Sequence, residues 1–217
     1  MLADALTPHL LGPRVRLRPF EHTDVDAVFA YASDPEITRY VEWQPHRTFG
    51  DSARYIERCL EDHADLQTFA VEHLERQRVI GAVDLRMVSR LWRIGEIGYT
   101  IARPYWGQGY NVEAGLLVIN YGFLELGLRR IQAICDVGNR RSYRTMEKLG
   151  MIREMIIYRA RFENGWPIDR YRYSIRRREW ERLPLYQSQP PRSDMRVAPG
   201  SGGTRVAARG RPWRRDP

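Results

Sequence analysis

Two glycines, Gly107 and Gly109, lie between an apolar strand pattern that ends at Ile101 and the clearest helical pattern in the sequence. Glycine has no Cβ, so the backbone at this junction can approach a ligand closely. The first N–H groups of a helix have no acceptor within the helix, and the helix dipole adds partial positive charge there. Together these groups would form a concave site suited to a phosphate. They are the N–H groups of Gly107, Gln108, Gly109, Tyr110 and Asn111.

The glycine pair alone is also compatible with a tight strand-to-helix turn that binds nothing. No Lys-Ser or Lys-Thr follows it, as a Walker phosphate-binding loop would require. Val112 stands three positions after Gly109, which departs from the GxGxxG dinucleotide fingerprint. These two nucleotide-binding motifs are therefore excluded.

The elements that must position this junction follow from hydrophobic periodicity. Strands are predicted at residues 14–20, 68–73, 79–88, 94–101, 131–137, 151–161 and 166–175, and helices at 23–33, 51–63, 109–126 and 139–149. One apolar stripe runs along the third helix and is formed by Val112, Leu116, Ile119, Phe123 and Leu126. Asn164-Gly165 is a strong hairpin turn signal between the last two strands. We therefore predict a single mixed α/β domain in which helices are interspersed along a mostly antiparallel sheet.

Composition divides the chain into a folded part and a basic tail. Hydrophobic residues make up 43% of the 217 residues, which is enough for one core. Of the net charge of +8, the seven arginines and two aspartates after residue 186 contribute +5, which leaves +3 for residues 1–186. That tail is also rich in proline and glycine, so we predict disorder at 187–217. The other predicted units are an N-terminal extension at 1–13 and a folded domain at 14–180.

The chain has no feature that favours a membrane or an oxidising compartment. No apolar run approaches the roughly 18 residues that a membrane-spanning helix needs. The first residues carry no basic segment and include Asp4, unlike a secretory signal. Cys59 and Cys135 are far apart and form no CxxC pair, and the five histidines show no metal-ligand spacing. We therefore expect a cytoplasmic protein that binds no metal and no membrane.

A second motif, NRRSYRTMEKLGM (Asn139–Met151), follows the glycine pair. Together with EIGYTIARPYWGQGYNVEA (Glu96–Ala114), it resembles the GNAT acetyltransferase superfamily, and within it the RimJ/RimL-like branch. The segments RLRPFEHTDVDAVF (Arg16–Phe29) and ENGWPIDRYRYSI (Glu163–Ile175) are similar to the first and last parts of that branch. The resemblance covers residues 14–180. Pro104 departs from the superfamily pattern Q/R-x-x-G-x-G/A, which has Gln or Arg at this position.

The resemblance implies acetyl transfer from acetyl-CoA, as co-substrate, to an amine. It places the pyrophosphate on the amides of Gly107–Asn111 and the pantetheine arm along the strand edge Tyr99–Ile101. It also implies that this strand and 131–137 splay apart to leave a slot for the thioester, with Asn139 and Ser142 at the thiol end of the arm. The implied cofactor-binding residues are Tyr99, Thr100, Ile101, Gly107, Gln108, Gly109, Tyr110, Asn111 and Asn139.

The resemblance also suggests a catalytic pair. Glu96 is the candidate base that takes a proton from the amine, directly or through water. It is also compatible with a salt-bridged strand carboxylate, and Asp84 and Asp136 are weaker candidates on neighbouring strands. Many relatives protonate the leaving thiolate with a tyrosine seven residues after the asparagine, where this chain has Met146. Ser142 is therefore the candidate donor, with an ordinary first-turn helix serine as the alternative.

The residues that select the amine are less clearly marked. Five side chains are assigned to the acceptor side, namely Trp43, Gln44, His46, Arg47 and Asp169. For His46, a surface loop position is the alternative. Asn111 and Glu113 are expected to brace the helix, and Trp106 to pack beside the phosphate site.

Three classes of function remain open. The first is N-acetyl transfer, either to the α-amine of a protein or ribosomal protein or to a small amine such as an amino acid, a polyamine or an antibiotic. The second is a non-catalytic acyl-CoA-binding or regulatory domain, which the presence of Gly107, Gly109, Glu96 and Ser142 disfavours. The third is a ribosome- or RNA-associated factor that uses the arginine-rich tail. A homodimer is compatible with all three.

Overall fold

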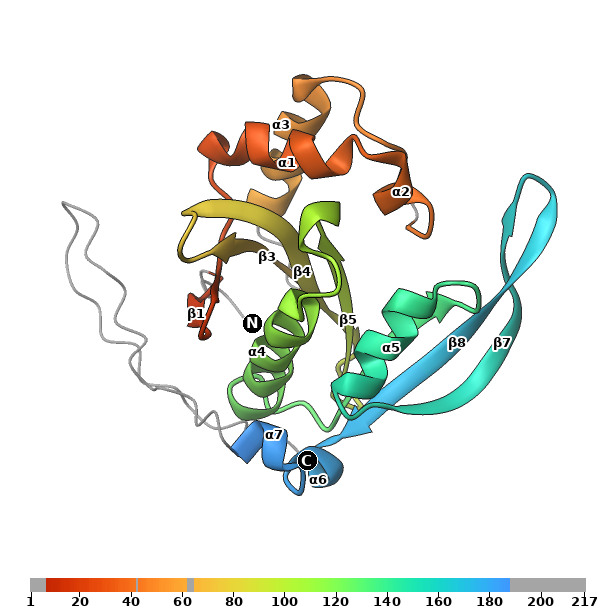
Figure 1. Cartoon of the computed structure of the whole chain (residues 1–217). Helices are drawn as coiled ribbons and strands as arrows, with labels where there is room; N and C mark the ends of the chain where they lie inside the picture. The colour runs from red at the N-terminus through yellow and green to blue at the C-terminus, as the bar shows by residue number, and fades with distance from the viewer. Residues whose placement is uncertain (1–6, 42, 62–64, 188–217) are drawn as a thin grey trace.

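An eight-stranded sheet organises the computed structural model, which describes residues 7–41, 43–61 and 65–187 (Figure 1). In chain order the strands are β1 (Leu10–Leu11), β2 (Val15–Arg18), β3 (Leu66–His73), β4 (Arg78–Ser89), β5 (Ile94–Ile101), β6 (Arg130–Asp136), β7 (Ile152–Glu163) and β8 (Trp166–Arg176). Their order in space is β1-β2-β3-β4-β5-β6-β8-β7. Neighbouring strands are antiparallel except β5 and β6, which are parallel.

Helices cover both faces of the central strands. They are α1 (Val25–Ala32), α2 (Pro35–Thr38), α3 (Phe49–Leu60), α4 (Tyr110–Leu124), α5 (Arg140–Lys148), α6 (Arg177–Trp180) and α7 (Pro184–Gln187), with 3-10 turns η1 (His22–Asp24) and η2 (Arg103–Tyr105). Side chains alternate between the two faces of a strand. Accordingly, Val83 of β4 joins the core around α4, whereas its neighbour Ala82 joins the core around α1 and α3. Each described helix is too short or too polar to span a membrane.

The predicted order of strands and long helices is confirmed, and so is the fold class of one mixed α/β domain. The short elements β1, α2, α6 and α7 lie where no element is predicted. Each has two to four residues, which is too few for a helical or strand periodicity to show in the sequence.

The folded unit extends beyond both ends of the predicted 14–180 domain. Leu10 and Leu11 form β1 and pair with β2, although they belong to the predicted N-terminal extension 1–13. Past residue 180, Tyr186 is buried, and its hydroxyl donates to the Leu149 carbonyl at 2.7 Å. The predicted tail 187–217 lies outside the described residues apart from Gln187.

Helix α4 is buried on more than one side, so the single apolar stripe predicted for it is too narrow. It contacts the central strands of the sheet, the edge strand β1, and α5. Val112 of the predicted stripe stays partly exposed, whereas two glycines bring the helix close to its neighbours. A Cβ on Gly115 would lie 2.8 Å from Leu149, and one on Gly122 would lie 2.8 Å from Ile131. The close packing fixes where the N-terminus of α4 lies relative to the sheet.

The parallel strands β5 and β6 pair at only three positions and then separate. Ile94, Gly95 and Glu96 pair with Arg130, Ile131 and Gln132. Beyond this point β5 continues to Ile101 and β6 to Asp136 without pairing to each other. The predicted splayed strands are therefore confirmed.

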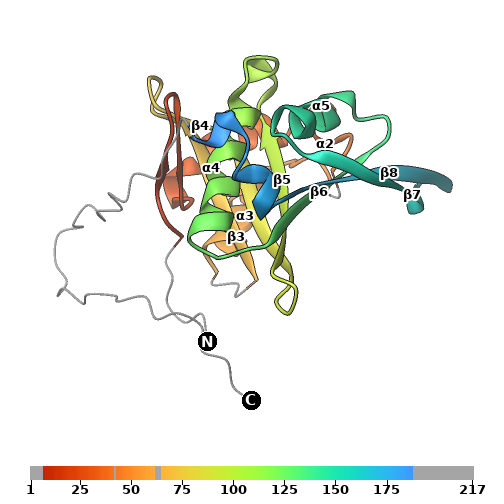
Figure 2. The same cartoon turned by 90° about the horizontal axis from the view of Figure 1, so that it is seen from below.

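The last two strands form a long hairpin that projects from the rest of the sheet (Figure 2). Its turn is Asn164-Gly165, as predicted, with φ of +50° and +81°. Six large apolar side chains on it are exposed, namely Ile152, Met155, Ile156, Tyr158, Phe162 and Trp166. They provide apolar surface, but a homodimer stays a prediction.

Candidate active site

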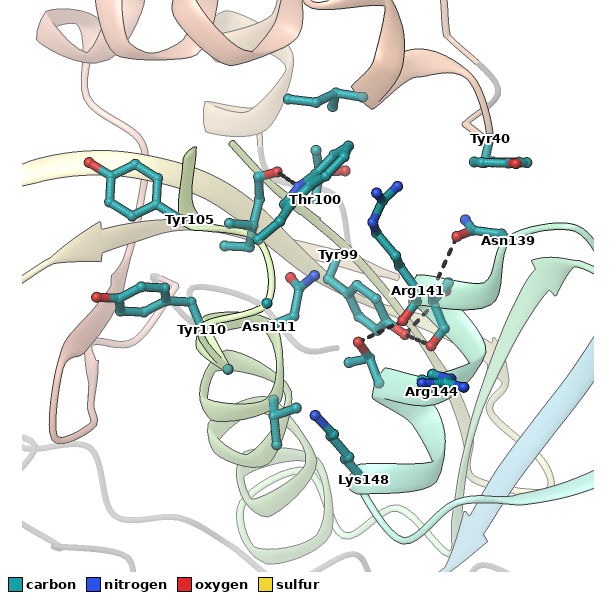
Figure 3. Close-up of a pocket in the computed structure, with 18 of the residues that line it drawn as sticks. Tyr40, Tyr99, Thr100, Tyr105, Tyr110, Asn111, Asn139, Arg141, Arg144 and Lys148 are labelled. Carbon is teal, nitrogen blue, oxygen red and sulfur yellow. Dashed lines mark hydrogen bonds between the residues drawn. The ribbon is translucent and has the colours of Figure 1, made fainter. Parts of the chain in front are cut away.

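A cleft of about 290 Å³ opens between α2, the end of β5, the N-terminus of α4, and α5 (Figure 3). Nine of the eleven predicted site residues line it, namely Tyr99, Thr100, Ile101, Gly107, Gly109, Tyr110, Asn111, Asn139 and Ser142. The other two, Gln108 and Glu96, are not among its lining residues. Two distant motifs thus meet in one cleft.

The N-terminus of α4 presents backbone N–H groups toward the cleft. Gly107 and Gly109 have φ of +76° and +85°, a conformation that glycine adopts without strain. The first helical bond runs from the Glu113 N–H to the Gly109 carbonyl at 3.0 Å, which leaves the earlier N–H groups without helical acceptors. A Cβ on Gly107 would meet no described atom within 4 Å, so this position faces open space. We call the backbone of Gly107–Asn111 the cradle.

A buried carboxylate holds the cradle in place. Glu113 accepts hydrogen bonds from the backbone N–H of Arg14 (2.6 Å) and Val15 (3.0 Å) and from Arg14 Nε (2.8 Å). Arg14 in turn donates to the Gln108 carbonyl at 3.0 Å, and the Gln108 side chain donates to the Pro104 carbonyl at 2.8 Å. The predicted bracing role of Glu113 is confirmed. The Gln108 side chain stabilises the turn rather than entering the cleft.

The cradle meets the requirements of a bound phosphate group and of the arm attached to it. Its N–H groups are donors, and the Asn111 Oδ1 atom is buried with no hydrogen-bond partner among the described residues. Acetyl-CoA carries phosphates for the N–H groups and amide N–H donors for such an oxygen. The residues present therefore fit the co-substrate that the sequence motifs imply.

Tyr99 of β5, Asn139 and Ser142 lie together at the far end of the cleft, and Cys135 of β6 lies beside Ser142. Tyr99 donates its hydroxyl to the Ser142 carbonyl at 2.9 Å and lies 3.2 Å from Ser142 Oγ (Figure 3). Asn139 caps α5 as predicted, because its Oδ1 accepts from the Ser142 N–H at 3.2 Å. Burial raises the pKa of Tyr99, and it raises the pKa of Cys135 to about 11. Both groups are therefore neutral proton donors at pH 7.

Several residues of the cleft were not predicted from the sequence. Arg141, Arg144 and Lys148 line it from α5, and their spacing of three and four residues was an available signal for one helix face. Trp106, which was predicted to pack beside the phosphate site, also lines the cleft and donates Nε1 to the Ile101 carbonyl at 2.6 Å. The Tyr99 hydroxyl was missed because the sequence suggested only a backbone role.

The opposite face of the sheet carries charged side chains. We call the face of β4, β5, β6, β8 and β7 that bears Asp84, Glu96, Gln132, Asp136, Arg172 and Glu154 the charged face. There, one Glu96 oxygen is paired with Arg86, and the other accepts from Gln132 Nε2 at 2.8 Å. Glu96 is therefore a salt-bridged strand carboxylate, which was the alternative to its role as a base. Whether it also accepts a proton stays a prediction.

The two weaker candidates for the base differ in their surroundings. Asp136 is buried and is held by Arg161 and by Arg170 Nε at 2.9 Å. Asp84 has no ion pair to a described residue, and burial raises its pKa to about 6. Asp84 is therefore more basic than an ordinary aspartate, whereas the pKa values of Asp51 and Glu72 are lowered.

The residues assigned to the acceptor side do not line the cleft. They are Trp43, Gln44, His46, Arg47 and Asp169. His46 Nδ1 lies 2.9 Å from Ser52 Oγ at the start of α3, and Asp169 accepts from the Arg159 N–H in a bulge of β7 at 2.9 Å. In the described ranges, no three His, Cys, Asp or Glu side chains converge as metal ligands would.

Comparison with known proteins points to one family. The model of the acetyltransferase (GNAT) domain matches residues 14–152. "Uncharacterized N-acetyltransferase p20" of Bacillus licheniformis is 32% identical over 174 residues, which cover 79% of this chain and 97% of that protein. A crystal structure of a GCN5-related N-acetyltransferase from Brucella melitensis superposes with a TM-score of 0.75 at 25% identity, over 84% of this chain and 85% of that one.

Two further relatives differ in the substrate that their names state. "Putative ribosomal N-acetyltransferase YdaF" of Bacillus subtilis is 33% identical over 119 residues, covering 55% of this chain and 65% of that protein. "Spermidine N(1)-acetyltransferase" of Escherichia coli is 28% identical over 162 residues, covering 75% of this chain and 83% of that protein. The names of these two relatives thus state different substrates.

Proposed function

The chain belongs to the GNAT family of acetyltransferases, and from this premise we propose that it acetylates the α-amine of a peptide or protein. It is an acetyl-CoA-dependent N-acetyltransferase, as its relatives are named. Within the family, the proposal assigns it to the RimJ/RimL-like branch. The observation that carries the proposal is the cleft in which the cradle lies next to the split between β5 and β6.

The proposed roles follow from where each group lies. The N–H groups of Gly107–Asn111 bind the pyrophosphate, and the free edge of β5 at Tyr99–Ile101 pairs with the pantetheine arm. Asn139 orients the start of α5, and Ser142 gives a proton to the sulfur that leaves. Acetyl-CoA supplies the activated acetyl group, and the protein binds and orients it.

Glu96, the base that the sequence motifs suggest, is proposed to position the opening between β5 and β6. Its carboxylate lies at the last paired position before β5 and β6 separate, and its partners Arg86 and Gln132 fix it there. It supports the opening through which an amine reaches the acetyl group. Because both of its oxygens already have partners, direct proton transfer to Glu96 would require one of these bonds to break.

The amine is proposed to approach from the charged face, and the charges of that face support an α-amine. A polyamine carries several positive charges and is best held by several unpaired carboxylates. On the charged face, Glu96, Asp136 and Glu154 are each paired with arginine. A substrate with one reacting ammonium group fits this surface better than a polycation does.

A small amine is the second candidate. Similarity to the spermidine enzyme favours it, and so does the exposed Glu36 at the edge of the cleft. The proposal also includes a cytoplasmic location and a contact between the basic tail and the ribosome. Both would bring the enzyme to the N-terminus of a ribosomal protein.

The test is a thiol-release assay with the full chain, acetyl-CoA and a panel of amines. The panel holds peptides with a free α-amine, the same peptides with a blocked α-amine and an internal lysine, spermidine, and an aminoglycoside. We expect release with the free peptides and mass-spectrometric acetylation of their first residue. Release with spermidine alone would replace the proposal with the small-amine function, and release with the blocked peptides alone would replace it with lysine acetylation.

A further inference from the structure

One carboxylate of the charged face, Asp84, stands apart from its neighbours. Glu96, Asp136 and Glu154 are each held by an arginine. Among the described residues, Asp84 forms no ion pair, and its hydrogen-bond donor is the backbone N–H of Gly98. A carboxylate with one donor keeps acceptor positions open for a ligand.

Asp84 lies directly over the backbone of β5. The register of β4 and β5 pairs Asp84 with Gly98. A Cβ on Gly98 would lie 2.7 Å from Asp84 Oδ2 and 3.1 Å from Oδ1. The carboxylate thus occupies the space that a Cβ at residue 98 would need, and a larger residue there would displace it.

Gly98 marks the place where the sheet opens. Pairing between β5 and β6 ends at Glu96 and Gln132, two residues before Gly98. The next residue, Tyr99, lines the cleft from the other face of the sheet (Figure 3). Because successive side chains of a strand point to opposite faces, Asp84 and Tyr99 flank the same opening from its two sides.

The surroundings of Asp84 keep it basic and reachable. The residue as a whole is partly exposed to solvent, while its carboxyl group is largely buried. Burial raises its pKa to about 6, the charge of Glu96 on β5 adds to this, and Arg86 on its own strand and the Gly98 N–H oppose it. From α3, Tyr55 and Cys59 face it, and burial raises the pKa of both, so both are neutral at pH 7.

We propose that Asp84 is the group that takes the proton from the attacking amine. This inference rests on the proposed function, since it concerns the amine that the enzyme acetylates. The ammonium group of the acceptor gives one proton to the Asp84 carboxylate and becomes a neutral amine. Its nitrogen lone pair then forms the bond to the acetyl carbon while the carbon–sulfur bond breaks.

The remaining protons balance without another reactant. The nitrogen loses its second proton as the amide forms, and the leaving thiolate takes up one proton to become the thiol. Asp84 returns its proton to water through the charged face. No oxidant, reductant or metal enters the step.

The assignment favours an amine of low pKa. An α-ammonium group has a pKa of about 7.7–8.0 and a lysine side chain one of about 10.4. Transfer to a carboxylate of pKa about 6 is unfavourable by about a hundredfold for the first and more than ten-thousandfold for the second. Asp84 therefore selects for α-amines by the ease of the proton transfer.

The first experiment compares three full-length variants, Asp84→Asn, Glu96→Gln and Asp26→Asn. Asp26 is exposed on α1 and serves as the matched control. Initial rates with an α-amino peptide are measured from pH 5.5 to 8.5, and acetyl-CoA binding is measured by calorimetry. We expect Asp84→Asn to lower kcat/KM by about a hundredfold at pH 6.5, within the 10²–10⁴ range of general base catalysis. Donor affinity and the Asp26→Asn rate should match the wild type.

The second experiment reads the ionisation of Asp84 without turnover. Carboxyl carbon NMR of the aspartate-labelled protein should contain one resonance that titrates near pH 6, and that resonance should be missing in Asp84→Asn. The pH profile of kcat/KM should lose its step near pH 6 in the same variant. A structural role of Asp84 would lower activity at all pH values without moving this step.

Each of three results would overturn the assignment. They are an Asp84→Asn variant with more than a third of wild-type kcat/KM at every pH, no aspartate that titrates between pH 5 and 7, and loss of the pH 6 step in Glu96→Gln alone. Failure of the proposed acceptor looks different. In that case the wild type acetylates another class of amine, and Asp84→Asn still shows the loss with that amine.

Discussion

The two sides of the splayed sheet bind charge in opposite ways. On the side of α4 and α5, the cradle N–H groups before Glu113 and the Asn111 oxygen have no partners among the described residues. On the charged face, Glu96, Asp136 and Glu154 are neutralised by arginines of the same chain. We therefore expect the first side to accept a highly charged ligand and the second side to accept a ligand of low charge.

This difference has a physical reason. Unpaired donors held rigidly by backbone bind a phosphate strongly, because no internal bond has to break when the ligand arrives. Paired charges offer little net attraction, because an incoming ion would have to displace an existing partner. We therefore expect acetyl-CoA to bind tightly through its charges, and the amine to bind weakly and with a dependence on pH.

The largest effect on donor binding is expected when a methyl group is added to the cradle. Gly107→Ala should weaken acetyl-CoA binding by about 10- to 100-fold, because loss of one or two hydrogen bonds to a charged group costs about 1.5–3 kcal/mol. The Cβ would project into the open space beside the Gly107 amide. The measurement is the dissociation constant from calorimetry.

Gly127→Ala is the matched control for that substitution. Gly127 also has a positive φ, +62°, and a Cβ there would also meet no described atom within 4 Å. Both variants should lose about 1–2 kcal/mol of stability from backbone strain, and only Gly107→Ala should lose affinity. Equal affinities in the two variants would show that the cradle does not bind the donor.

A smaller effect is expected at the far end of the donor side. Ser142→Ala should lower kcat by about tenfold, the low end of what a proton donor contributes, with little change in donor affinity. A thiol has a pKa of about 8.5, so the leaving sulfur needs a proton less as pH rises above that value. The ratio of wild-type to variant kcat should therefore shrink between pH 7 and 9.5. Weaker acetyl-CoA binding at constant kcat would make Ser142 a binding residue.

The donor side could be predicted because its geometry is local. Gly107–Asn111 is a run of five residues, and the cap from Asn139 to Ser142 spans four. A strand end followed by glycines and a helix start is enough to orient such N–H groups. Bracing of this turn by Arg14 and Glu113 crosses 99 residues, and no local pattern indicated the ion pair between them.

The charged face could not be predicted in detail because its pairs are set by strand register. Gln132 lies 36 residues from Glu96, and Glu154 lies 24 from Arg130. A shift of one residue in register moves every side chain of a strand to the other face. The sequence marked Glu96 and Asp84 as candidates, but only the register shows that Glu96 is paired and that Asp84 covers Gly98.

The arginine pairs of the charged face are expected to stabilise the fold. Glu154 joins Arg130, Arg172 Nε (3.4 Å) and Ser174 Oγ (2.7 Å), and its side chain is 21% exposed. Glu154→Gln should lower the free energy of unfolding by about 1–2 kcal/mol, between the values for exposed and buried pairs. That loss corresponds to about 3–6 °C in Tm, while acetyl-CoA affinity stays unchanged.

Glu181→Gln provides the comparison for an exposed pair. Glu181 pairs with Arg177 at 3.2 Å, and both side chains are about half exposed, at 54% and 41%. Its loss should lower Tm by less than about 2 °C. A similar small change in Glu154→Gln would mean that the arginine pairs of the charged face add little to stability.

The smallest effect concerns the protonation of His46, which lies beside the N-terminus of α3. Burial lowers its pKa, Arg58 and Arg54 lower it further, and Asp51 opposes them. The unfolded chain therefore binds more protons than the folded chain between the folded pKa and about 6.5. Stability from this group is fully present above about pH 6.5 and is lost as pH falls toward the folded pKa.

The measurement is Tm at pH 7.5 and at pH 5.5 for the wild type and for His46→Gln. The wild type and the variant share all other titrating groups. Any difference between their decreases in Tm from pH 7.5 to pH 5.5 is therefore due to His46. The wild type should lose up to about 2 °C more than the variant, because the His46 ring is partly exposed and its charge is partly solvated. If the variant loses more, the Nδ1 contact to Ser52 must be a bond from the charged ring. The loop before α3 would then carry an additional positive charge at pH 5.5. The difference in charge between the cradle and the other side of the sheet would be smaller.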